Sequence, residues 1–300
     1  MEGEPASFSI GRLANYTGIA VDTLRKWEQR YGYPQAERLP SGHRRYGHEE
    51  VRRLRRIAEA IQRGVPVRTA VSAREAELEQ LLSERTGSPA LAEQTSSWLK
   101  HVQNYSKFEF GQALEQTVEQ LGVERFLEEA LAPWLTELGA LWAQGELDVR
   151  HEHFATEVIV DLLRSLLARH GSRSSGPRVV FATLPGEHHV LGLWMGALSA
   201  AHAGADARLL GANLPLDEIA HAAIENGARG VAISISLASG GVAADRMLAE
   251  LRDKLGPGVN LMVGGDGARG ARRGPRGVSY FESFGRLTAW VNELARRNDA

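Results

Sequence analysis

The chain has 300 residues, of which 43% are hydrophobic and 24% are charged, a composition that suits a globular protein of two or three domains. It has no cysteine, which excludes disulfide frameworks, thiolate zinc sites and iron–sulfur clusters. The N-terminal residues show no basic segment followed by an apolar run, and no apolar stretch approaches the ~20 residues that cross a bilayer, so we expect a cytoplasmic protein.

The net charge of −2 hides an uneven distribution of charge along the chain. Residues 1–70 contain 13 Lys and Arg against 8 Asp and Glu, whereas residues 71–170 contain 8 against 17. A basic head that precedes an acidic middle segment indicates a polyanionic partner for the head.

Residues 8–70 have the pattern of a helix, a tight turn, a second helix, a basic loop and a longer helix. Ser9 can cap the first helix, and Asp22 opens the second one in the stretch DTLRKWEQRYG. In this second helix Leu24 and Trp27 are expected to face the core. The side chains expected to project outward are Thr23, Arg25, Lys26 and Arg30.

The basic loop ERLPSGHRRYGHEEV, residues 37–51, is expected to form a protruding wing. Its guanidinium groups can donate paired hydrogen bonds to phosphate oxygens while the preceding helix enters the major groove. A run of basic residues alone is more often a solvated surface, but the helix–turn–helix beside it favours DNA binding. The wing residues expected to contact DNA are His43, Arg44, Arg45 and Tyr46.

Residues 8–75 resemble the MerR family of winged-helix regulators through IGRLANYTGIAVDTLRKWEQRYG and the following GHRRY. The resemblance implies that Arg44 and Tyr46 hold phosphates, that Thr23 and Arg25 read bases, and that paired heads bind a palindromic site. The long coiled-coil helix that usually joins MerR dimers is not indicated here, because the sequence has no sustained heptads. Oligomerisation is therefore expected to come from elsewhere in the chain.

The acidic middle segment has apolar residues at helical spacing, which predicts an antiparallel four-helix bundle. Trp142 is expected to end the third helix, and Glu152 with His153 to begin the fourth, so that the loop between them brings all three to one end of the bundle. A core-capping tryptophan and two helix-capping polar residues are the alternative interpretation. The four helices are expected at 89–104, 108–121, 123–143 and 150–169.

From Pro177 onward the pattern changes to alternating strands and helices, which predicts a flavodoxin-like, doubly wound α/β domain with five parallel strands. Its ligand is expected at the carboxyl ends of the strands. No GxGxxG follows the first strand, and no Ser or Cys stands on a nucleophile elbow, so neither a dinucleotide site nor a hydrolase site is indicated. The expected strands are RVVFATL, ADARLLG, GVAISIS, VNLMVGG and VSYFES.

The loops of this domain resemble the cobalamin-binding domain of methionine synthase and the mutases, whose pattern is D-x-H-x-x-G, then S-x-L, then G-G. Here the first part reads Glu187-x-His189-x-x-Gly192. The resemblance implies that His189 is the lower axial ligand of cobalt, displacing the cofactor's own base. It implies that Glu187 orients His189 and that Gly192 lets the helix start approach the corrin. His188 is expected to be a bystander.

The other two parts of the pattern appear as Ser234-Ile235-Ser236 and Gly264-Gly265. The resemblance implies that Ser234 lines the slot for the nucleotide tail of cobalamin and that Gly264 and Gly265 leave room for its base. Two positions depart from the family pattern. Glu187 replaces Asp, which changes the reach of the carboxylate, and Ser236 replaces Leu, which loosens the packing of its loop.

A MerR head, a helical bundle and a cobalamin domain in one chain resemble the CarH/CarA-type photoreceptor repressors of carotenoid synthesis genes. That family carries W-x9-E-H in its bundle, which Trp142, Glu152 and His153 match. The resemblance implies that these three enclose the adenosyl group of adenosylcobalamin. It implies a dark tetramer that holds operator DNA, and monomers after light breaks the cobalt–carbon bond. It also raises an antirepressor as a further partner of the head.

Some relatives place a histidine directly after the tryptophan, where it binds cobalt after photolysis, but this chain has Ala143. His151, His153 or a water is expected to take that place. An enzyme is the first alternative function, although no segment is long enough for a substrate barrel. The second is a repressor whose cobalamin domain senses another tetrapyrrole or binds a protein without light.

These expectations divide the chain into a DNA-binding head, a linker, a bundle that caps the upper face of the corrin, and a cobalamin-binding domain. The boundaries are expected at 1–75 for the head, 76–88 for the linker, 89–172 for the bundle and 173–300 for the cobalamin-binding domain.

Overall fold

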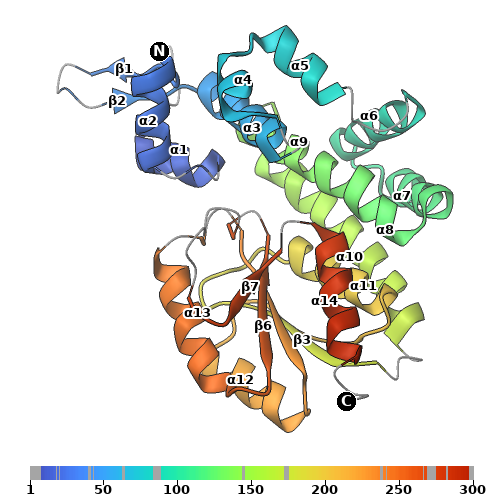
Figure 1. Cartoon of the computed structure of the whole chain (residues 1–300). Coiled ribbons are helices and arrows are strands. Elements are labelled where there is room, and N and C mark those ends of the chain that lie inside the picture. Colours follow the sequence, from blue (N-terminus) through green and yellow to red (C-terminus); the bar gives the residue numbers. More distant parts are fainter. Residues whose placement is uncertain are drawn as a thin grey trace. The chain divides into compact units, whose positions relative to one another are not determined.

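A computed structural model of the chain forms two compact units, Met1–Thr86 and Gly87–Ala300, which are described separately (Figure 1). No described helix has both the length and the apolar character needed to cross a membrane. The structure describes residues 8–17, 19, 21–39, 42, 44–62, 65–83, 89–143, 146–171, 176–236, 239–240, 242–265, 267–268, 275–281 and 283–296.

The first unit has the elements of the expected winged helix–turn–helix. Ser9 Oγ accepts a hydrogen bond of 3.4 Å from Arg12 N–H at the start of the first helix, and Leu24 and Trp27 are buried as predicted. The wing is a two-stranded antiparallel ribbon. The elements are α1 (Ile10–Thr17), α2 (Val21–Tyr31), β1 (Glu37–Arg38), β2 (Arg44–Arg45), α3 (His48–Gln62), α4 (Val67–Ser72) and α5 (Glu75–Ser83).

Helix α5 lies in the segment where a linker was expected, and this is a difference from the expectation. It packs on α3, with Leu78 fully buried in the core of the head, and Arg56 of α3 forms an ion pair with Glu75. The burial of Leu78 and the Arg56–Glu75 ion pair both stabilise the packing of this short helix on the head. Residues 84–88 of the expected linker lie outside the described part of the chain.

The second unit begins with the expected four-helix bundle. Its third helix is interrupted by a π-helical turn just before Pro133, which has no N–H to donate and crowds the preceding turn. An aromatic group fills the bundle, with the ring centroids of Trp98 and Trp134 5.5 Å apart. The elements are α6 (Pro89–Gln103), α7 (Lys107–Leu121), α8 (Val123–Arg125), η1 (Phe126–Leu131), α9 (Ala132–Ala143) and α10 (Val149–Gly171).

A five-stranded parallel sheet of order β4-β3-β5-β6-β7 follows, which confirms the doubly wound fold. Helices α12 and α13 cover one face, and α11 and α14 cover the other (Figure 1). The elements are β3 (Arg178–Thr183), α11 (Leu191–His202), β4 (Asp206–Gly211), α12 (Leu216–Glu225), β5 (Gly230–Ser234), α13 (Val242–Leu255), β6 (Asn260–Gly264), β7 (Val278–Tyr280) and α14 (Phe284–Arg296).

The bundle and the sheet domain share one hydrophobic core. Met195 and Leu198 of α11 are buried in the same cluster as Leu163 of α10. At the surface of this contact the Arg164 guanidinium lies 5.4 Å from the centroid of the Trp194 ring, a cation–π distance. Helix α10 therefore connects the end of the bundle to the helix that follows the His189 loop.

Candidate cobalamin and DNA sites

The His189 loop leaves the carboxyl end of β3 through a turn at Gly186, whose φ is +83°. Thr183, the last residue of β3, is fully buried. Its Oγ1 donates to the Glu187 carbonyl at 2.8 Å and accepts from Asn213 N–H at 2.8 Å. Asn213 Oδ1 in turn accepts from Gly186 N–H at 2.8 Å. The loop base is thus fixed by hydrogen bonds to the loop after β4.

One oxygen of the Glu187 carboxylate holds His189. Oε1 lies 2.7 Å from His189 Nδ1 and also accepts from His189 N–H at 2.8 Å. The Glu187 side chain is only 2% exposed, whereas that of His189 is 62% exposed. Because the carboxylate accepts at Nδ1, the imidazole carries its proton there and presents Nε2 as a possible metal ligand.

The other oxygen of Glu187 connects this loop to the loop after β5. Oε2 accepts from Ser236 N–H at 2.7 Å and from the Ser239 hydroxyl. Burial alone would raise the pKa of Glu187, but the hydrogen bonds from His189, Ser236 and Ser239 hold it well below its usual range. The hydrogen bond to Glu187 raises the pKa of His189, and the charge of Glu152 adds to the effect.

Ser239 was not among the predicted site residues. Its only sequence signal is its position three residues beyond Ser236, in a loop of small residues.

Gly192 and Ser234 are brought together by the structure. A Cβ built on Gly192, in the first turn of α11, would lie 2.8 Å from Ser234 Oγ. Gly192 therefore allows α11 to pack closely on the end of β5. The expected approach of Gly192 to a corrin remains a prediction.

Gly264 and Gly265 stand at the end of β6, as expected. At each position a close neighbour leaves no room for a Cβ. A Cβ on Gly264 would lie 2.0 Å from Cζ of Phe281. Gly265 has φ +96°, and a Cβ there would lie 2.4 Å from the Ile235 carbonyl oxygen. The space beside Gly264, which was expected to admit the base of the cofactor, is occupied by the Phe281 ring in this structure.

The expected upper-face residues lie where α9 ends and α10 begins. Trp142 is 38% exposed at the end of α9. Glu152 and His153 lie in the first turn of α10, with His153 Nε2 4.0 Å from Glu152 Oε2. The charge of Glu152 acts on the pKa of His189, so these two residues of different layers lie within electrostatic reach of each other.

His151 has a local role at the same helix end. Its Nδ1 accepts a hydrogen bond of 3.2 Å from Asp148 N–H. Its ring stacks on Tyr105, with a centroid distance of 5.1 Å and an interplanar angle of 17°. His151 thus ties the start of α10 to the α6–α7 connection.

In the head, the expected DNA-contacting residues gather between the second helix and the wing. Arg25 of α2 and Arg44 and Arg45 of β2 line one pocket of about 360 Å³ together with Ser9, Ile10 and Gly42. Arg44 Nε is 3.1 Å from Glu28 Oε1, an ion pair that joins the wing to α2. Lys26 and Arg30 are exposed and Thr23 is half-buried. His43 lies outside the described residues.

Tyr46 differs from the expectation that it projects from the wing. Its side chain is packed in the head core at 1% exposure, and its backbone pairs with Phe8 through hydrogen bonds of 2.8 and 3.0 Å. Burial of the aromatic ring stabilises the base of the wing. The hydroxyl is buried without a hydrogen-bond partner in the described part of the head, and burial raises its pKa.

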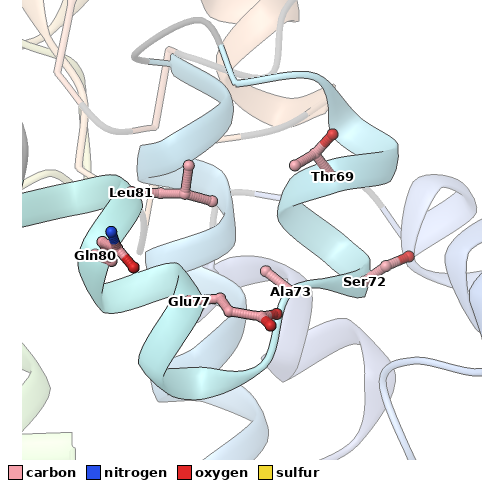
Figure 2. Close-up of a pocket in the computed structure, with 6 residues that line it drawn as sticks. All are labelled: Thr69, Ser72, Ala73, Glu77, Gln80 and Leu81. Atoms are coloured by element: carbon pink, nitrogen blue, oxygen red, sulfur yellow. The ribbon is translucent and has the colours of Figure 1, made fainter.

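A second pocket of about 470 Å³ lies between α4 and α5 (Figure 2). Thr69, Glu77 and Leu81 are among its lining residues, and Glu77 forms an ion pair of 2.6 Å with Arg74. None of the predicted site residues line this pocket.

Comparisons with known proteins find both domain types along the chain. The MerR HTH family regulatory protein profile matches residues 8–76, and two B12 binding domain profiles match residues 97–166 and 177–281. The Methanosarcina barkeri monomethylamine corrinoid protein has a similar fold, with a TM-score of 0.54 and 12% identity over 68% of this chain and 99% of that chain.

Two repressors of Myxococcus xanthus are similar along most of the sequence. The HTH-type transcriptional repressor CarH is 29% identical over 88% of this chain and 90% of its own. The HTH-type transcriptional repressor CarA is 30% identical over 95% of this chain and 96% of its own. These relatives are repressors and not enzymes. The chain belongs to the CarH/CarA family of HTH-type transcriptional repressors, with a MerR head and B12 binding domains.

Proposed function

We propose that this repressor senses light with adenosylcobalamin, holding operator DNA as a dark tetramer and releasing it as monomers after illumination. The head, bundle and cobalamin-binding domain would be 1–75, 89–172 and 173–300. Genes of carotenoid synthesis are the proposed target. The observation that carries the proposal is the buried Glu187 carboxylate, which fixes one nitrogen of an exposed imidazole and leaves the other available.

The residues at the strand ends fit a corrinoid bound from below. His189 offers a single nitrogen ligand, which suits a metal that arrives with its other ligands already in a ring. Glu187 keeps the imidazole in the tautomer that binds metal. In the described part of the chain no three His, Asp or Glu side chains are grouped to hold a free metal ion.

The upper side of the same space is supplied by the end of the bundle. Trp142, Glu152 and His153 would enclose the adenosyl group, with the indole stacked against it and the two polar residues holding its ribose and base. The charge of Glu152 acts on the pKa of His189, so the start of α10 and the His189 loop lie within electrostatic reach of each other, and this supports the proposal. The cofactor would supply a cobalt–carbon bond that light breaks.

The connection from cofactor to oligomer would run through α10. This helix carries Glu152 and His153 at its start and packs on α11, which follows the His189 loop. Loss of the adenosyl group would remove the contacts of Glu152 and His153 with it, and these contacts would hold the start of α10 in place. Tethered heads in a tetramer gain from effective concentration on a palindromic operator, and separated heads lose this gain.

The head would bind the operator through the pocket lined by Arg25, Arg44 and Arg45. The wing guanidinium groups of Arg44 and Arg45 suit a phosphate, and Arg25 of α2, at the same depression, would read a base. Burial raises the pKa of the Tyr46 hydroxyl and the charges of Arg44 and Arg25 act to lower it, so this hydroxyl lies within electrostatic reach of both arginines. An antirepressor that binds this face would compete with operator DNA for the same arginines.

The test is to purify the full chain with adenosylcobalamin in darkness and to measure its mass and DNA affinity before and after green light. The probe is a duplex selected from a randomised pool by the dark protein. We expect a tetramer that binds the probe in darkness and a monomer with weaker binding afterwards. His189→Ala should abolish both responses. Operator binding that ignores both cofactor and light would overturn the proposal and favour a light-independent repressor.

A further inference from the structure

The ring of Phe281 occupies the place beside Gly264 at the end of β6. Three residues at the carboxyl ends of the strands are in register, Thr183 of β3, Ser234 of β5 and Gly264 of β6. Residues two positions earlier, such as Ala232 and Met262, belong to the core under α11 and α14. Because side chains alternate along a strand, the three end residues face the same side.

On this side the residues at the ends of β5 and β6 are small, and the Phe281 ring covers the second of them. Ser234 is small and Gly264 has no side chain, whereas the next residues back, Ile233 and Val263, are large, buried and on the opposite face. The Cζ and Cε1 atoms of Phe281 would lie 2.0 and 2.2 Å from a Cβ on Gly264. The tip of the ring therefore fills the volume that the missing side chain leaves.

Phe281 lies at the edge of the sheet, and its ring is only partly enclosed. It directly follows β7, a three-residue strand at the edge of the sheet. Its N–H donates to the Val263 carbonyl at 3.0 Å, which anchors the backbone but not the ring. Its side chain is half-buried, and it packs against the core under α11 and α14 from the outside.

We propose that the Phe281 ring fills the subsite for the lower base of cobalamin in the unloaded protein and sets which bases can enter. This inference rests on the proposed cofactor. When His189 replaces the lower base at cobalt, that flat aromatic base remains tethered to the corrin and must find an apolar place nearby. The space beside Gly264 and Ser234, at the same strand ends as the His189 loop, is such a place, and Phe281 keeps it dry until the base enters.

The test compares a corrinoid that has the nucleotide tail with one that lacks it. Hydroxocobalamin and aquocobinamide are mixed in darkness with the wild type, Phe281→Ala and Phe281→Leu, and imidazole ligation is followed by absorbance. Tyr280→Ala is the matched control, because it removes the ring of the neighbouring residue from the opposite face. Circular dichroism checks that each variant is folded.

We expect Phe281→Ala to bind hydroxocobalamin about tenfold faster than the wild type, the factor for a subsite open in about one molecule in ten. Phe281→Leu should lie between the two. Aquocobinamide should bind all proteins at similar rates, and Tyr280→Ala should behave as the wild type with both corrinoids. Equal acceleration of both corrinoids, or unchanged or slower hydroxocobalamin binding by folded Phe281 variants, would overturn the inference. A wild type that ligates neither corrinoid would instead contradict the proposed cofactor site, and the inference with it.

Discussion

At the scale of single residues, the Glu187 carboxylate uses both oxygens for different purposes. Oε1 fixes the ring and backbone of His189, and Oε2 binds the Ser236 N–H and the Ser239 hydroxyl across the loop after β5. A buried carboxylate with four donors stays ionised, as the lowered pKa of Glu187 shows. The orientation of the imidazole is thereby coupled to the position of the neighbouring loop.

Glu187→Gln should weaken cobalamin binding by about 10- to 100-fold, the usual cost of losing the residue that orients a metal-binding imidazole. The amide keeps the shape but loses the charge that attracts the Nδ1 proton of His189. The measurement is an absorbance titration with hydroxocobalamin in darkness. Asp206→Asn is the control, since Asp206 is a paired carboxylate at the start of β4. Equal losses in both variants would show a general effect of charge removal.

His151 and His153 differ in whether a ring nitrogen would be available to cobalt in the proposed light state. His151 Nδ1 accepts the Asp148 N–H, so the neutral ring carries its proton on Nε2 and has no free lone pair. His153 is 74% exposed. We therefore expect His151→Ala to leave the absorption spectrum of illuminated protein unchanged. A shifted light-state spectrum in this single variant would contradict the assignment, and an unchanged spectrum in the His151→Ala, His153→Ala double variant would leave water as the ligand.

At the scale of elements, the loops after β5 and β6 are held together through their backbones. Ile235 N–H donates to the Gly264 carbonyl and Gly267 N–H donates to the Ile235 carbonyl, both at 3.0 Å. This close approach is possible because Gly265 has φ +96° and no Cβ facing the Ile235 carbonyl. Gly265, directly after β6, therefore has a structural role in the protein without cofactor.

Gly265→Ala should destabilise the second unit by roughly 2–4 kcal/mol, because the new Cβ combines a disfavoured φ with a backbone clash. Gly258→Ala is the matched control, since a Cβ there meets nothing within 4 Å. The free energy of unfolding in urea, followed by circular dichroism, compares the two variants with the wild type. Similar stability of the two would mean that the loops can separate without cost.

The sequence was sufficient for elements that depend on periodicity. The bundle helices expected at 108–121 and 150–169 are found at Lys107–Leu121 and Val149–Gly171, because apolar spacing reports which side of a helix is buried. Glu187 and His189 were expected to interact because their loop resembles that of a known family, and Glu187 Oε1 lies 2.7 Å from His189 Nδ1. The Ser239 and Phe281 contacts were missed because they join segments that only the folded sheet brings together. Tyr46 was misplaced because an aromatic residue in a basic loop can face either the core or DNA.

At the scale of the whole molecule, the shared core of α10 and α11 would limit the movements available to the proposed light response. Met195 and Leu198 are buried against the bundle, so separating the two layers would expose much apolar surface. The change is therefore expected at the start of α10, near Glu152. Leu198→Ala should cost about 2–5 kcal/mol in the free energy of unfolding while leaving the dark absorption spectrum of bound cobalamin unchanged.

Cooperation between heads can be read from the salt dependence of DNA binding. The slope of log K against log salt concentration is negative, and each phosphate contact adds about 0.9 to its magnitude. If the dark tetramer engages two heads on one operator, Arg45→Ala removes one contact from each head and should lower this magnitude by about 1.8. If the illuminated protein binds with one head at a time, the same variant should lower it by about 0.9. Arg246→Ala, which removes an exposed arginine from α13, is the control and should change neither slope. Equal decrements in darkness and light would show that the heads bind independently, so that the switch would have to act within a single head.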